Sequence, residues 1–61
     1  MKTVIFKTLK GYATTNEENY NARIRDERRV MDCSQFDTPE EIIEYYCKYF
    51  GATEEEFIVK A

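Results

Sequence analysis

The stretch DTPEEIIEYYCKYFG, residues 37–51, is the most informative part of the sequence about the fold, because it carries the start and stop signals of a helix. Thr38 is expected to cap the amino end, and Pro39 fits the first helical position. Glu41 completes a Thr-x-x-Glu capping box. Gly51 is the residue type that ends a helix in the left-handed conformation. One helix of about three turns is therefore expected here.

The predicted helix, about 38–50, has one broad apolar face and one charged face. Glu44 and Lys48 are four residues apart on the charged side, a spacing at which an acidic and a basic side chain stabilise a helix. At about 100° per residue, the apolar side chains gather on the other side of the helix. Such a helix must bury its apolar face against another element. The residues of that face are Ile42, Ile43, Tyr46, Cys47, Tyr49 and Phe50, with Tyr45 at its edge.

Near the amino end, β-branched and aromatic residues predict a strand over about residues 2–10. Because strand side chains alternate between two faces, Val4 and Phe6 point one way and Ile5 points the other. Apolar residues on both faces indicate an interior strand or one that is covered on both sides. Gly11 is expected to end or bend this strand.

The region of about residues 16–31 is ambiguous, because helical and strand patterns overlap in it. Thr15 and Glu18 fit a capping box and favour a helix, whereas the asparagines of this region favour turns over helix interiors. The apolar alternation from Tyr20 to Ile24 favours a strand. We expect the strand, paired with the first one as an antiparallel hairpin with a short connection.

The last segment, about residues 54–60, also admits two interpretations. Thr53 and Glu56 form another capping box, which favours a second helix. The β-branched residues Ile58 and Val59 favour a short strand. We expect the strand, which would join the sheet after the helix.

Together the segments predict an α+β fold in a single domain, 1–61. It consists of a small antiparallel sheet of three or four strands with the amphipathic helix, about 38–50, packed on one face, in the order β-β-(β)-α-β. The helix is expected to meet a sheet face formed by Val4, Phe6, Ile24 and Ile58. The other face, around Ile5, Leu9, Tyr12 and Val30, is expected to be only partly covered.

Aromatic residues are abundant for so short a chain. Nine of the 61 residues are Phe or Tyr, and a domain of this size has only one small core. Some rings should therefore lie on the surface, where aromatic residues mark contacts with other proteins. We expect a homodimer or a protein partner to cover them.

Charge is distributed unevenly along the chain. Residues 1–33 contain seven Lys or Arg and five Asp or Glu, whereas residues 34–61 contain two Lys and seven Asp or Glu. A chain polarised in this way can pair head to tail with itself or attract an oppositely charged partner. Four arginines, here named the arginine strip, lie close together at Arg23, Arg25, Arg28 and Arg29.

The arginine strip has three interpretations: a solvated face, a protein contact or a nucleic-acid contact. Basic side chains displace counterions from phosphates, and Tyr12 and Tyr20 are candidate stacking platforms beside them. However, Asp26, Glu27 and Asp32 lie among the arginines, and the isoelectric point of about 4.9 is low for a nucleic-acid domain. We therefore rank the solvated face first, a protein contact second and nucleic acid third.

Catalytic and metal-binding chemistry finds little support in the sequence. The chain has no histidine, two cysteines and two glycines, so the common proton shuttle, a four-ligand zinc set and a glycine-rich phosphate loop are all missing. We expect no enzyme activity, no cofactor, no metal site and no small-molecule substrate.

Export and membrane signals are not evident either. The first residues contain only a short apolar run, unlike a secretory signal, and no apolar run approaches the length of a membrane span. We expect a cytoplasmic protein in which Cys33 and Cys47 stay reduced and act as small buried apolar residues.

These observations favour a small non-enzymatic protein-interaction module, an accessory or regulatory protein that acts as a homodimer or on a protein partner. The alternative is a nucleic-acid-binding regulator that uses the arginine strip, 23–29. The expected partner-binding residues are Tyr12, Tyr20, Arg23, Arg25, Arg28, Arg29, Tyr45 and Tyr49.

Overall fold

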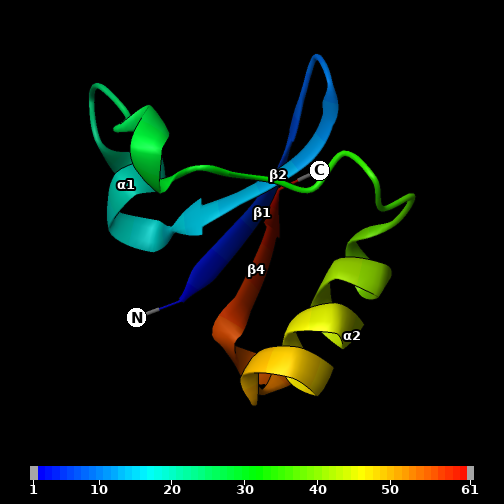
Figure 1. Ribbon diagram of the computed structural model, residues 1–61. Coiled ribbons are helices and arrows are strands. Elements are labelled where there is room, and N and C mark those ends of the chain that lie inside the picture. The colour runs from blue at the N-terminus through cyan, green and yellow to red at the C-terminus, as the bar shows by residue number, and fades with distance from the viewer. Residues whose placement is uncertain (1, 61) are drawn as a thin grey trace.

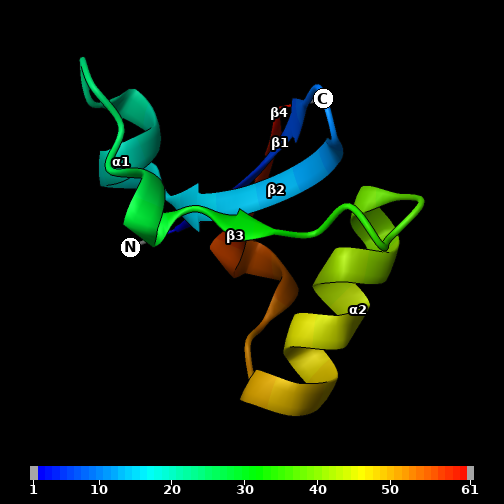
Figure 2. The ribbon, with the colours of Figure 1, turned by 45° about the horizontal axis from the view of Figure 1, so that its top comes forward.

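A computed structural model describes residues 2–60 and shows an α+β fold with one four-stranded sheet. The strand order is β3-β2-β1-β4. Figure 1 labels β2, β1 and β4, and Figure 2 also labels β3. In chain order the elements are β1 (Thr3–Thr8), β2 (Gly11–Asn16), α1 (Glu17–Asn21), the 3-10 helix η1 (Glu27–Arg29), β3 (Met31–Asp32), α2 (Pro39–Phe50), the 3-10 helix η2 (Glu54–Glu56) and β4 (Phe57–Lys60).

The expected fold class is confirmed, but the sheet is mixed and not wholly antiparallel. β2 is antiparallel to β1 and to β3, whereas β4 is parallel to β1. Two antiparallel reversals give β3 the same direction as β1. Because α2 then returns the chain to the end of the sheet where β1 starts, β4 also runs in the direction of β1.

The second strand lies earlier in the chain than we expected. It follows a tight turn after β1, with Thr8 opposite Gly11 and Val4 opposite Thr15. Gly11 has a φ of +134°, and a Cβ there would lie 3.2 Å from atoms of Ser34, so glycine suits this position. Thr14 is buried in β2 although its side chain is polar. The apolar pattern missed this strand because two of its three buried residues, Thr14 and Thr15, are polar.

The prediction of a strand within residues 16–31 is wrong. Residues Glu17–Asn21 form the short helix α1, and an irregular segment joins α1 to η1. Asn16 caps α1, since its Oδ1 accepts a hydrogen bond from the backbone N–H of Asn19 at 2.6 Å. Ile24, which we expected in the core, is 86% exposed, because the chain has left the sheet at this point.

Both faces of β1 are covered, as the alternation of its apolar residues indicated. Val4 and Phe6 belong to one buried cluster, and Ile5 belongs to another. We predicted that the helix covers the sheet face of Val4 and Phe6. This is wrong, because Ile42 of α2 packs with Ile5 and Cys33 on the other face. Figure 2 shows α1 and α2 on opposite sides of the sheet. Alternation along a strand separates two faces without saying which face a distant helix will cover.

Helix α2 begins and ends where the sequence predicted. The Thr38 Oγ1 accepts a hydrogen bond from the backbone N–H of Glu41 at 3.3 Å, and Pro39 lies in the first turn. Gly51 closes the helix in the left-handed conformation, with φ +68°. Ile42 is fully buried, whereas Phe50, expected on the buried face, is 64% exposed. The expected final strand is confirmed as β4.

Candidate protein-binding surface

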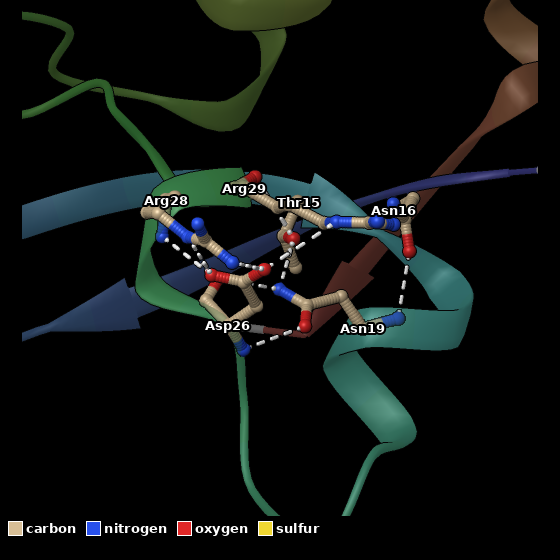
Figure 3. Close-up of polar contacts among 6 residues, drawn as sticks. All are labelled: Thr15, Asn16, Asn19, Asp26, Arg28 and Arg29. Carbon is tan, nitrogen blue, oxygen red and sulfur yellow. Dashed lines mark hydrogen bonds and ion pairs between the residues drawn. The ribbon is translucent and has the colours of Figure 1, made fainter.

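The loop that carries the arginine strip is fixed by one buried amide, that of Asn19. Its Nδ2 donates to Thr15 Oγ1 at 2.8 Å and to the Asp26 carbonyl at 3.1 Å. Its Oδ1 accepts from the Asp26 N–H at 2.8 Å. Figure 3 shows Asn19 lying between β2 and the start of η1. The amide thus substitutes for the strand pairing that this segment lacks.

Two arginines of the strip share a single counter-ion, Asp26. Arg28 forms a forked contact with it, from Nε to Oδ1 at 3.1 Å and from Nη2 to Oδ2 at 3.2 Å. The Nε of Arg29 lies 3.6 Å from Oδ2 (Figure 3). The hydrogen bonds from the Arg28 side chain and backbone lower the pKa of Asp26. Because one carboxylate offsets two guanidinium groups, the strip offers less free charge than the sequence indicated.

The other two arginines have different surroundings. The guanidinium of Arg25 lies over the Tyr20 ring at 4.4 Å and over the Phe6 ring at 4.9 Å. Its Nε also donates to the Tyr20 carbonyl at 3.3 Å. Arg23 is exposed and forms no ion pair with any residue of 2–60. The arginine strip is therefore not a row of four equivalent cations.

The tyrosines expected beside the strip do not lie together. Tyr20 packs against Phe6 with ring centroids 5.3 Å apart, on the face of the sheet covered by α1. Tyr12 packs on the opposite face, in the cluster that contains Ile42. The two rings cannot serve as one stacking platform, since the sheet separates them.

The exposed rings instead gather along α2. Tyr45, Tyr49 and Phe50, here named the aromatic surface, are 38%, 62% and 64% exposed. The Tyr45 centroid lies 4.8 Å from that of Tyr49 and 5.9 Å from that of Phe50. Sequence reasoning selected the two tyrosines but placed Phe50 in the core. Its position in the last turn, directly before Gly51, is the signal that it could extend beyond the sheet.

Tyr46 fixes this part of α2 to the sheet. Its ring contacts Phe50 at 5.4 Å and Phe57 of β4 at 5.7 Å. Its hydroxyl bonds to Thr14 Oγ1 at 2.8 Å and to Met31 Sδ at 3.1 Å. Burial raises the pKa of Tyr46, against the opposing effect of the Thr14 hydrogen bond. The residue beside the aromatic surface is thus held to the sheet by both apolar and polar contacts.

The two cysteines are free, and they differ in burial. Cys33 is 2% exposed and packs with Ile5 and Ile42, so it behaves as the small buried residue we expected. Burial raises the pKa of the Cys33 thiol. Cys47 is half-buried and lines a hollow of about 590 Å³ on the flank of α2. The other residues of this hollow are Glu40, Ile43, Glu44 and Glu54.

Two further features bear on the kind of site. In residues 2–60, no three His, Cys, Asp or Glu side chains are grouped so that they could hold a metal ion. Over the same residues, no helix has both the length and the apolar character needed to cross a bilayer.

Comparison of the chain with protein-family models, curated proteins and solved structures gave no match. The aromatic surface is the largest group of exposed, mutually packed apolar side chains on the helix, and it is the candidate binding site.

Proposed function

We propose that this chain is a small non-enzymatic protein-interaction module that binds a partner polypeptide through the aromatic surface. The observation that carries this proposal is the exposure of Tyr49 and Phe50, both above 60%, within one packed group of rings. Aromatic side chains are enriched among the residues that dominate binding at protein interfaces. The module would act as an accessory or regulatory protein.

The rings pack against one another and against a neighbouring ring in the free chain. Tyr45 contacts Phe36 at 5.3 Å as well as Tyr49 at 4.8 Å, so the exposed rings are supported from the side. Binding to ordered side chains costs less conformational entropy than binding to mobile ones. Burial of a large exposed ring contributes on the order of 2 kcal/mol.

The aromatic surface lies in the acidic part of the chain, and this charge indicates what kind of partner fits. Residues 34–61 contain seven acidic and two basic residues, and Glu40, Glu41 and Glu44 are exposed on α2. A partner with an apolar contact surface and a net positive charge would be complementary. Lys48 is the local exception, since its Nζ lies over the Tyr49 ring at 5.5 Å.

The test compares two variants in the same capture experiment. Tyr49→Ser with Phe50→Ser removes two exposed rings, whereas Leu9→Ser removes an apolar side chain that is fully exposed at the β1–β2 turn. Proteins retained by the wild-type chain and by Leu9→Ser, but lost with the double variant, support the proposal. Calorimetric titration with the retained protein should then show at least a tenfold loss of affinity for the double variant. Equal affinity of the two variants would contradict it.

Nucleic-acid binding through the arginine strip is the second candidate. Arg25, stacked on Tyr20, and the exposed Arg23 favour it, but Asp26 offsets Arg28 and Arg29, so we rank it below protein binding. Retention of DNA or RNA at low ionic strength that weakens steeply with added salt would support this second candidate. No retention at low salt would remove it.

We also propose a cytoplasmic location. Cys33 and Cys47 are both free thiols, which suits a reducing compartment. Fractionation of the native host cells should recover the chain with the cytoplasmic proteins, and recovery in another fraction would contradict this.

A further inference from the structure

We propose that the outer edge of β4 pairs antiparallel with β4 of a second copy of this chain, so that two sheets join across a two-fold axis. In the strand order β3-β2-β1-β4, β4 has a neighbour on one side only. This surface is separate from the aromatic surface, and the inference does not depend on what the aromatic surface binds.

The edge of β4 carries few of the features that prevent pairing with other strands. Its residues are Phe57, Ile58, Val59 and Lys60, with no proline, no glycine and one charge at the end. Sheet edges of this kind are templates for further strands unless they are covered or charged. Val59 is 46% exposed and would gain a cross-strand neighbour.

The helices lie over other strands and leave this edge free. On one face α2 meets β1 through Ile42 and Ile5, and meets β2 through Tyr46 and Thr14. Its contact with β4 is made by Phe57, on the face of the strand and not on its edge. On the opposite face, α1 packs over β1 through Tyr20 and Phe6, and its closest neighbours are β1 and β2. Backbone groups along the outer side of β4 thus have room for a second strand.

The alternation of side chains restricts the register of such a pair. Phe57 belongs to the buried cluster on the α2 face, and Ile58 belongs to the cluster on the other face. A two-fold axis perpendicular to the sheet keeps each face on its own side. Residues directly opposite each other must therefore share a face, which excludes every register that sets Phe57 opposite Ile58.

Among the permitted registers, one also pairs opposite charges. With Ile58 opposite Ile58 of the second copy, Phe57 lies opposite Val59, and Glu56 lies opposite Lys60. Glu56 and Lys60 are exposed and form no ion pair with each other or with other residues of 2–60. A shift of two residues either way sets one of these charges opposite Ile58.

This charge complementarity argues that the occupant is a second copy. The strand has an acid directly before it and a base at its end, so its own reversed sequence is its electrostatic complement. A two-fold interface then contains each contact twice. An unrelated strand would need the opposite arrangement of charges by coincidence.

A charge exchange tests both the pairing and its register. Glu56→Lys alone gives a homodimer with two Lys–Lys contacts, and Lys60→Glu alone gives one with two Glu–Glu contacts. A mixture of the two variants restores two Lys–Glu contacts in a heterodimer. Since like charges directly opposite are destabilising, each variant alone should dimerise roughly tenfold more weakly than the wild type. The mixture should recover wild-type affinity.

Sedimentation velocity over a concentration series at low ionic strength measures these affinities. Glu44→Lys, the same charge change away from β4, should leave dimerisation unchanged, and circular dichroism should show that every variant is folded. Tyr49→Ser should also still dimerise, which separates this inference from the proposed function. A wild-type chain that stays monomeric at millimolar concentration would overturn the proposal, and so would a mixture that dimerises no better than its components.

Discussion

Replacement of Asn19 by Ala should destabilise the protein strongly, although the residue is a polar side chain in a short helix. The amide is 7% exposed and makes three hydrogen bonds, two through Nδ2 and one through Oδ1. Its partners are Thr15 in β2 and the backbone of Asp26. An alanine at this position would leave these partly buried groups without their hydrogen-bond partner.

The size of the effect follows from those bonds. A typical hydrogen bond contributes about 1 kcal/mol net, and a buried group left without a partner costs more. Water can reach the Asp26 backbone in part, which reduces the loss. We therefore expect Asn19→Ala to lower the free energy of unfolding by about 2–3 kcal/mol. For a domain of this length, such a loss lowers the melting temperature by roughly 10–20 °C.

Urea denaturation followed by circular dichroism measures this loss. Asn21→Ala is the matched control, because Asn21 is the exposed asparagine at the end of α1, and we expect it to change stability by less than about 0.5 kcal/mol. Limited digestion with trypsin gives a second measurement, since a loop released from Asn19 should be cut faster after Arg23 and Arg25, whose side chains are already exposed. Equal stability and equal digestion of the two variants would refute the role assigned to Asn19.

Three other predictions concern the cluster between α2 and the sheet and the two cysteines. Thr14→Val and Tyr46→Phe should show a coupling of about 1 kcal/mol in a double-mutant cycle, because their hydroxyls share a 2.8 Å hydrogen bond; additive effects would contradict this. Burial raises the pKa of the Cys33 thiol above its value in the unfolded chain. The contribution of this thiol to stability is therefore complete below the unfolded pKa and is lost as pH rises from there through the higher pKa of the folded state. The free energy of unfolding should therefore fall above about pH 8, and a Cys33→Ala variant that falls equally would count against this cause. In the native protein a thiol reagent should modify Cys47 much faster than Cys33, as mass spectrometry of the labelled peptides would show, because only Cys47 is partly exposed.

The parts of this protein whose signals are local could be predicted from the amino-acid sequence. The cap at Thr38, the start at Pro39 and the stop at Gly51 define α2 within about fifteen residues, because caps act through neighbouring backbone groups. The alternation in β1 likewise predicted burial on both of its faces.

Features that depend on residues far apart in the chain could be seen only in the folded protein. Thr14 in β2 is buried because the hydroxyl of Tyr46, from α2, satisfies it, and no pattern within β2 reveals that partner. Asn19 joins β2 to Asp26 across an irregular loop, so a segment that alternates like a strand leaves the sheet. The choice of face for α2, and with it the exposure of Tyr49 and Phe50, depends on how the chain returns from β3 to the side of β1. Local sequence does not encode that path, because both faces of β1 are apolar.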